Sequence, residues 1–298
     1  MKPTLYLTAT LSLALGGSAA FAQSPAPKLS PPTRAQFDGY WSRGQAEITS
    51  YTLKQSRYGE IHEGHAVTVF VTEPFSRSKQ VKLDDPGRAG RDHVPVLKLN
   101  LTRKFNTGVY PYSMMTSVFT PRTLEPTIKV TTTSQEWCGH TFTQLNLRGK
   151  SYDTKLFSYF ESESDRRVEI PAALTEDELF TRIRLDPSRL PTGAVRLIPG
   201  TTYQRLRHTR FGVEEATATL KAGAVMRYRV EYRDLARTLE IEFEAAFPHR
   251  ILGWTERLSR RPDARLTTRA TRKATLMSDY WNRNGNVDRG LRDQLGLP

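Results

Sequence analysis

Hydrophobic and polar residues alternate one by one through the segment 226–254. A period of two is typical of strands that bury one face, and the polar stretch 234–237 interrupts it. We therefore predict a β-hairpin with its loop at 234–237. This register leaves one unfavourable pair of like charges, Glu231 opposite Glu240. The predicted pairs on the apolar face are Tyr232 with Leu239, Val230 with Ile241 and Tyr228 with Phe243.

The same alternation recurs along most of the chain, in segments separated by Gly, Pro or Asp. Regularly spaced segments of this kind are typical of an antiparallel meander. No alternation of strand and helix patterns is present, which argues against a doubly wound α/β sheet. We predict a mainly β protein with a strongly curved antiparallel meander sheet or an open barrel. The main expected strands are 46–57, 67–72, 97–102, 110–120, 128–138, 141–147, 151–161, 193–199, 216–220, 250–258 and 265–276.

One short packed helix is predicted at about 175–185. Thr175 and Glu178 form the capping-box pattern that begins a helix, and Leu174 can pack against Leu179 as a hydrophobic staple. Pro187 ends the segment because proline cannot continue a helix. We expect this helix to pack against the sheet or to fill its concave side.

The N-terminus has the three parts of a secretory signal peptide. A basic start at Lys2 is followed by a short apolar run, and Ala20-Phe21-Ala22 supplies the small residues of a cleavage site. The apolar run is shorter than the roughly 20 residues that span a bilayer. We expect residues 1–22 to be removed after Ala22, which gives a periplasmic or secreted product.

The remaining chain is expected to form a single large β-rich domain, 35–298, after a proline-rich linker, 23–34. A subdivision near 165–190 is the alternative. An apolar content of 38% supports a packed core. Cys138 is the single cysteine, so an internal disulfide is excluded.

A formal net charge of +13 favours anionic partners. Export argues against nucleic acid and favours an anionic envelope lipid, through peripheral contact with a membrane. Arg265, Arg269 and Lys273 alternate with small and apolar residues, so we expect them to form a basic ridge on one face of the sheet. Such a ridge can meet lipid phosphates, and a plain solvated face is the alternative.

Cys138 and His140 are the residues that most suggest catalysis. An adjacent histidinium would lower the pKa of a thiol and raise its thiolate fraction, as in cysteine hydrolases and transferases. In a strand, however, residues two apart share a face without touching, and the sequence shows no third group that would orient the histidine. We expect Cys138 to be structural and partly buried.

His62 and His65 resemble a fragment of a metal site, with Asp92 or His93 as additional ligands. Zincins need two histidines four apart on a helix, whereas these two are three apart in an expected loop at 59–64. A solvent-exposed loop without metal is the alternative, and we expect no cofactor.

An adaptable apolar group of the kind that lines ligand cavities lies at the start of the segment 110–120. Its use as ordinary core packing is the alternative. Gly-rich phosphate loops, G-x-S-x-G elbows and paired-carboxylate signatures are not evident, which lowers the expectation of an enzyme. The candidate ligand-binding residues are Tyr110, Tyr112, Met114, Met115 and Trp137.

Taken together, several motifs make the chain resemble a family of exported bacterial envelope proteins without an established activity. Some members of that family carry the label septum formation inhibitor Maf. True Maf proteins resemble cytoplasmic nucleotide pyrophosphatases on an α/β fold, whereas this chain begins with an export signal and a β meander. The architecture is also similar to half-barrels of the lipoprotein-carrier type, which implies a concave sheet that holds acyl chains. The motifs are Trp41-x-x-Gly44, Gln55-x-Arg57-Tyr58-Gly59-Glu60, Lys79-Gln80-Val81-Lys82, Lys104-Phe105-Asn106-Thr107-Gly108, Tyr110-Pro111-Tyr112-Ser113-Met114-Met115, Gln135-Glu136-Trp137-Cys138-Gly139-His140 and Phe247-Pro248-x-x-Ile251-Leu252-Gly253-Trp254.

The leading hypothesis is an exported protein that binds an apolar or amphiphilic envelope component without catalysis. A hydrolase or transferase that uses Cys138 and His140 is the second hypothesis. A structural module that binds an envelope protein is the third. The sequence leaves the oligomeric state open.

Overall fold

The computed structural model describes residues 29–258 and 266–298. The predicted signal peptide, the first half of the predicted linker and Arg265 lie outside these ranges. The described strands all belong to one sheet. They are β1 (Ala46–Arg57), β2 (Glu60–Ser76), β3 (His93–Thr107), β4 (Tyr110–Pro121), β5 (Lys129–Glu136), β6 (Gly139–Arg148), β7 (Ser151–Ser158), β8 (Arg166–Pro171), β9 (Leu174–Thr175), β10 (Gly193–Ile198), β11 (Glu214–Lys221), β12 (Met226–Tyr232), β13 (Arg237–Phe243), β14 (Ile251–Leu258) and β15 (Thr268–Ser278).

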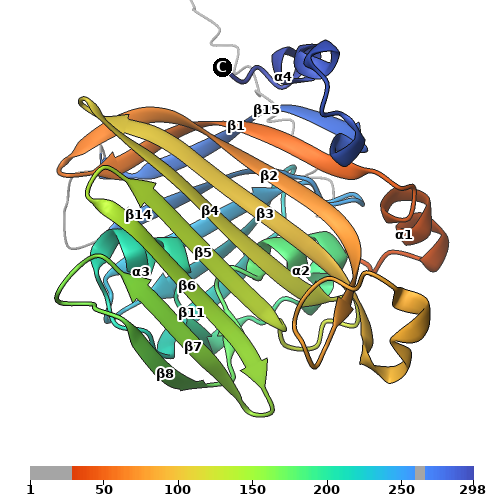
Figure 1. Cartoon of the computed structure of the whole chain (residues 1–298), viewed down its shortest axis with the longest axis horizontal. Coiled ribbons are helices and arrows are strands. Elements are labelled where there is room, and N and C mark those ends of the chain that lie inside the picture. The colour runs from red at the N-terminus through yellow and green to blue at the C-terminus, as the bar shows by residue number, and fades with distance from the viewer. Residues whose placement is uncertain (1–28, 259–265) are drawn as a thin grey trace, which may run out of the picture.

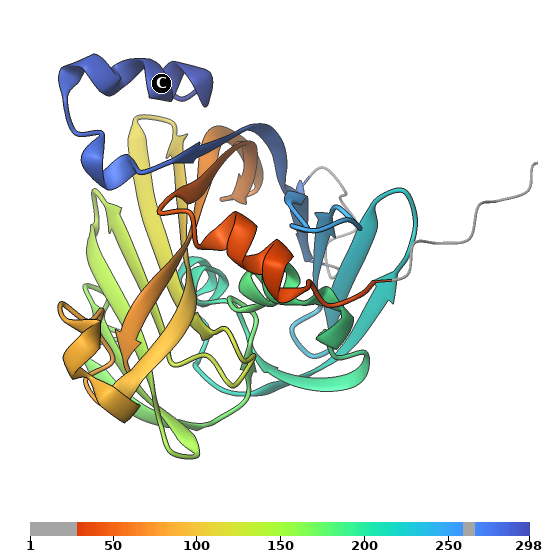
Figure 2. The ribbon, with the colours of Figure 1, turned by 90° about the vertical axis from the view of Figure 1, so that its right-hand side faces the viewer.

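The sheet is a long meander with fifteen described strands, and it is not closed into a barrel. Its order is β8-β7-β6-β5-β4-β3-β2-β1-β15-β14-β13-β12-β11-β10-β9, so β8 and β9 are the two edges. Adjacent strands are antiparallel except β9 and β10, which are parallel. Figures 1 and 2 show that the sheet bends strongly around its concave side. The prediction of a mainly β fold with a curved meander or open barrel is confirmed.

Four short α-helices accompany the sheet within the described ranges. Helices α2 and α3 lie inside the curve of the sheet, as the green and teal ribbons of Figure 2 show. Among these residues no helix has the length and apolar character to cross a membrane. The helices are α1 (Arg34–Trp41), α2 (Leu179–Leu185), α3 (Thr201–Arg207) and α4 (Gly290–Gln294), and the 3-10 turns are Pro86–Arg88, Gly90–Asp92, Pro187–Arg189, Tyr280–Asn282 and Asn286–Arg289.

The predicted helix at 175–185 is present as α2, but it begins at Leu179. Thr175 and Glu178 do form the reciprocal capping-box bonds, at 2.8 and 3.3 Å. Thr175 also belongs to β9, where it pairs with Ile198. Strand pairing therefore holds Thr175 extended, and a turn separates it from the helix.

The predicted hairpin is confirmed as β12 and β13, but its register differs by two residues. The loop is 233–236, and Tyr232 pairs with Arg237. A shift of two keeps every side chain on the predicted face. It also replaces the predicted pair of glutamates by Arg229 opposite Glu240. The observed register thus avoids the repulsion between two glutamates, because Glu231 pairs with Thr238.

The concave side is filled by aromatic packing around α2. The ring of Phe180 lies edge-on to Trp254, with ring centroids 5.4 Å apart, and Tyr51 meets the same indole at 5.0 Å. Buried together, such rings contribute several kcal/mol through their apolar area. These contacts fasten the helix to strands β1 and β14.

A buried ion pair joins α2 to β1. Both guanidinium Nη atoms of Arg184 bind the carboxylate of Glu47, and Arg184 Nε donates to the carbonyl of Pro248 at 2.8 Å. Both side chains are 1% exposed. The hydroxyl of Tyr40 also donates to Glu47. These contacts satisfy the two charges, as burial requires.

Threonine hydroxyls line the concave face of β4 and β5 and bind the helices above them. Thr120 lies 2.6 Å from Thr181 of α2, and Thr132 lies 2.5 Å from Thr201 of α3. Thr127 donates to Glu178 at 2.6 Å. The interior is therefore partly polar, and its polar atoms fix the positions of both helices.

Candidate functional site

Helix α3 is held at both ends. The backbone N–H and the hydroxyl of Thr201 donate to Oδ2 of Asp177 at 3.0 and 2.9 Å. Burial raises the pKa of Asp177 to about 6. At the other end His208 adopts a left-handed conformation with φ of 53°, and its N–H donates to Gln204. These caps direct Arg205 and His208 toward strands β6–β8.

A groove of about 460 Å³ lies between the end of α3 and the concave face of β6–β8. Cross-strand pairing assembles one wall, because Leu156 lies between Thr143 and Arg166, and Thr154 lies beside Val168. The volume lies within the range of small-molecule sites. The second wall comprises Gln204, Arg205, His208, Arg210 and Phe211.

Buried polar atoms without a hydrogen-bond partner in the described part of the chain gather on this groove. Buried polar groups in proteins are nearly always paired with protein, water or ligand. Atoms of this kind can pair with water or with a ligand that enters the groove. They are Oγ1 of Thr154, Oε1 of Gln204, Nε of Arg205 and Oγ1 of Thr209.

Two contacts with carboxylates fix the inner end of the groove. Arg205 binds the carboxylate of Glu136, and Nδ1 of His208 lies 2.6 Å from Oε1 of Glu163. Burial lowers the pKa of the Arg205 guanidinium, which nevertheless stays charged beside Glu136. These contacts position the end of α3.

Two further arginines at the groove have no acidic partner among residues 29–258 and 266–298. Arg166 on β8 donates to the carbonyl of Ser162, and Arg210 follows the end of α3. Their neighbour Arg167 points to the other face and pairs with Asp153 at 2.7 Å. Arg166 and Arg210 outnumber Glu163, the acidic residue in the groove lining, so the groove carries a net positive charge.

A second hollow, of about 450 Å³, lies over β10–β12. Its large side chains are charged, and both acidic and basic residues are among them. Such a lining offers little apolar surface to a small molecule. The groove beside α3 is therefore the better candidate.

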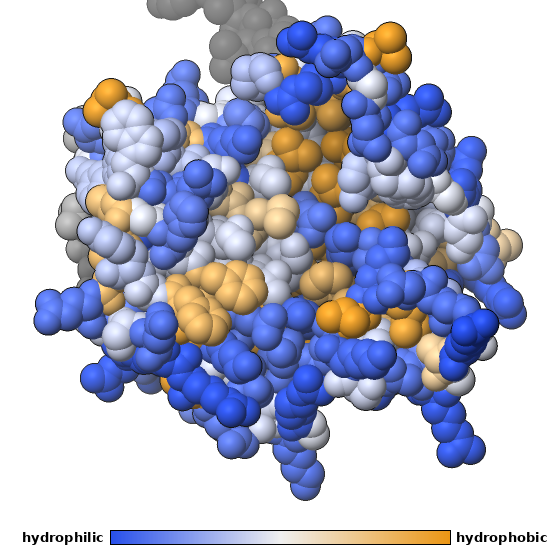
Figure 3. All heavy atoms as spheres, viewed as in Figure 1, coloured by the Kyte–Doolittle hydropathy of each residue, from blue (hydrophilic) through white to orange (hydrophobic). Residues whose placement is uncertain are grey.

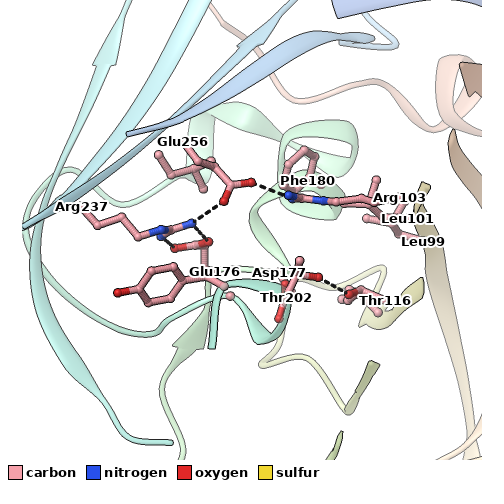
Figure 4. Close-up of a pocket in the computed structure, with 14 residues that line it drawn as sticks. Leu99, Leu101, Arg103, Thr116, Glu176, Asp177, Phe180, Thr202, Arg237 and Glu256 are labelled. Carbon is pink, nitrogen blue, oxygen red and sulfur yellow. Dashed lines mark hydrogen bonds and ion pairs between the residues drawn. The ribbon is translucent and has the colours of Figure 1, made fainter. Parts of the chain in front are cut away.

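A closed chamber of about 20 Å³ lies deeper in the concave side, and Figure 4 shows its charged lining. Arg237 binds both carboxylate oxygens of Glu176 and also reaches Glu256 at 3.3 Å. Arg103 binds Glu256 at 2.7 Å. Burial opposes the charge of Glu256, yet Arg103 and Arg237 lower its pKa to about 2. The chamber has room for about one water molecule, so it is too small for a ligand.

The structure corrects the expectation for Cys138, which is exposed and does not lie in a strand. Trp137 and Cys138 form the two-residue turn between β5 and β6. Strand β5 ends at Glu136 because the chain reverses there. The hydroxyl of Tyr110 lies 3.0 Å from Sγ of Cys138. Within the described residues no hydrogen bond joins Cys138 to His140, so the catalytic pair of the second hypothesis has no supporting contact.

The expected loop at 59–64 is also wrong, since β2 begins at Glu60 and carries both candidate metal ligands. Residues three apart on a strand point to opposite faces, which separates His62 from His65. Asp92 binds Ser76 near the far end of β2. In the described part of the chain no group of three or more His, Cys, Asp or Glu side chains could hold a metal ion.

The predicted ligand-binding residues divide between core and surface. Tyr112 and Met114 are 2% exposed and belong to the main core, while Met115 on the other face is 39% exposed. Tyr110 packs edge-on against Tyr112, with centroids 5.1 Å apart. Trp137 is 66% exposed at the turn. None of the five lines the groove beside α3.

The predicted basic ridge is only partly described. Arg269 is exposed on β15, whereas Nζ of Lys273 donates to the carbonyl of Gly296 at 2.6 Å. A bulge beside Lys273 shifts the register of β1 and β15. Arg265, the third member, lies outside the described residues.

The groove cannot be predicted from the sequence because the segment that forms α3 lacks the pattern of a helix. Its residues Thr201, Thr202 and Tyr203 have low helix propensity, which masks the helix. The available signal was Gly200 before two threonines, followed by basic residues at the C-terminal end. No sequence pattern links α3 with β6–β8.

No protein-family profile matches the chain, and no curated protein sequence matches it. Among solved structures, the chain is similar to a β-barrel-like protein of a domain of unknown function, DUF1849, from Brucella abortus. The two are 8% identical, with a TM-score of 0.47, over 78% of this chain and 98% of that chain.

Proposed function

We propose that the protein binds an anionic amphiphile, without catalysis, in the groove between α3 and β6–β8. The observation that carries this proposal is the lining itself. Buried polar atoms without partners and two unpaired arginines lie beside an apolar wall. An anionic head group would pair with the arginines, since guanidinium groups bind carboxylate and phosphate through paired hydrogen bonds. An acyl chain would lie on Leu156, Val168 and Phe211.

The proposed amphiphile is an envelope component because the N-terminus has the pattern of an export signal. That signal also supports a periplasmic or secreted location for the mature chain. A lipid source fits the mixed apolar and basic character of the groove better than a nucleic acid, which would require a much longer basic surface.

Calorimetric titration of the mature chain, residues 23–298, tests this proposal. Dodecyl phosphate and dodecyltrimethylammonium carry the same alkyl chain and opposite charges. We expect the phosphate to bind and the ammonium to bind at least ~10-fold more weakly, given the energy of a charge-assisted hydrogen bond. Equal affinity for both, or no binding of either, would contradict the proposal.

A charge-reversal pair locates the site. Arg166→Glu and Arg210→Glu should each weaken binding of dodecyl phosphate by roughly 10-fold. Arg167→Glu is the matched control, because Arg167 lies next to Arg166 in sequence and on the opposite face of β8. A loss of affinity in the control equal to that in Arg166→Glu would move the site away from the groove.

A further inference from the structure

Four hairpin tips at one end of the sheet expose large side chains. In an antiparallel meander every second turn lies at the same end, which brings together the turns after β1, β3, β5 and β7. These turns lie along the left side of Figure 1. Tyr58 is 63%, Val109 81%, Trp137 66% and Tyr159 67% exposed. We call these four residues the rim.

The rim continues into an aromatic band. The hydroxyl of Tyr58 lies 2.8 Å from that of Tyr112, and Tyr112 packs against Tyr110. Tyr110 in turn lies edge-on to Trp137, with ring centroids 6.2 Å apart. Tyr159 packs against the backbone of Gly139, beside the same turn. In the view of Figure 3, pale and orange side chains gather along this left edge.

Basic side chains lie on the outer face of the sheet behind the rim. Lys54 and Arg269 are directly opposite each other on β1 and β15, and Lys104 lies on β3. All three are exposed, and Lys54 lies opposite Glu63 of β2. Acidic residues of the same tips offset these basic groups, so apolar burial at the tips provides the main attraction. They are Glu60, Glu63, Glu161 and Asp165.

We propose that the rim docks on the surface of an anionic phospholipid bilayer. Trp and Tyr favour the membrane interface, where an apolar ring and a polar edge are both satisfied. Four separate tips can enter a fluid lipid layer together, whereas a protein partner would need a matched pocket for each tip. The net charge of +13 adds attraction to anionic lipid. This proposal is independent of ligand binding in the groove.

Vesicle co-sedimentation tests the rim. The mature chain should bind vesicles of 30% phosphatidylglycerol in phosphatidylcholine more strongly than vesicles of phosphatidylcholine alone. Trp137→Ser and Val109→Ser should each lower the partition coefficient roughly 10-fold, from the apolar area that they remove. Trp281→Ser is the matched control, since Trp281 is 42% exposed and follows the opposite end of β15.

Unchanged binding in both rim variants, or no binding of the unaltered chain, would overturn the proposal and favour a protein partner.

Tryptophan fluorescence tests the intact rim. Trp41 and Trp254 are buried, so Trp281→Phe leaves Trp137 as the exposed indole. Its emission should shift to the blue on vesicles and be quenched by brominated lipid, and no shift would contradict docking. Val109→Ser should keep the affinity of the groove for dodecyl phosphate, which separates this test from ligand binding in the groove.

Discussion

Removing Arg184 should destabilise the fold strongly, because its charge compensates Glu47 in the interior. Both side chains are 1% exposed. Arg184→Met preserves the aliphatic volume but deletes the guanidinium and its bond to Pro248. Breaking a buried ion pair on one side costs about 3–5 kcal/mol. For a chain of this size the cost corresponds to a fall in Tm of about 6–20 °C.

The loss of stability in Arg184→Met should depend on pH, because it follows the charge of Glu47. In the native protein burial raises the pKa of Glu47, but Arg184 outweighs it and lowers the pKa below the ordinary value. The pair therefore stabilises the fold above the ordinary glutamate pKa, and that stability is lost as pH falls. In Arg184→Met, burial acts on Glu47 without the guanidinium and raises its pKa. The variant should therefore recover stability, relative to the unaltered protein, between pH 8 and pH 5.

Thermal unfolding followed by circular dichroism at pH 5 and pH 8 measures both effects. Glu47→Gln combined with Arg184→Met should recover part of the lost stability, since no buried charge remains. An Arg184→Met variant that is as stable as the unaltered protein at pH 8 would refute the reasoning. An Arg184→Met variant whose stability does not increase on acidification, or on addition of Glu47→Gln, would refute it as well.

Three further predictions concern the fold and the hairpin tips. Gly64→Ala should destabilise the fold by about 2 kcal/mol or more, because the added Cβ would overlap the carbonyl of Lys104. Gly39→Ala is the control and should stabilise the fold slightly, because the space around Gly39 is open. Equal effects of the two substitutions in urea unfolding would contradict this prediction. Cys138 should react fully with a thiol reagent in the folded state, and protection without denaturant would show that the turn is buried. Glu256, whose pKa is lowered to about 2, should stabilise the fold at neutral pH and lose that contribution as pH falls toward 2. A Glu256→Gln variant that unfolds in acid at the same pH as the unaltered protein would contradict this prediction.

Alternating patterns predicted most strands because burial of one face imposes a period of two. They could not fix the hairpin register, since a shift of two residues keeps the same faces. The observed register places Arg237 inside the sheet, where Glu176 and Glu256 bind it. Those partners lie on other segments, so the local pattern gave no sign that an arginine would be buried.

The pattern of polar and apolar residues also did not predict the structure at the candidate sites. Cys138 was expected in a strand, but a two-residue turn exposes it. The groove depends on α3 crossing to β6–β8, which brings Arg210 near Arg166 although they are distant in sequence. Short helices with β-branched residues carry weak local signals, and packing decides them.

Native mass spectrometry, with solvent extraction, tests the central claim most directly. The chain from Gln23 would be purified without detergent from the cells that produce it. We predict a co-purifying anionic amphiphile that is lost in Arg166→Glu and retained in Arg167→Glu. A mass without ligand in the unaltered chain, or a ligand that both variants retain, would contradict binding in the groove and would favour an envelope protein as the partner.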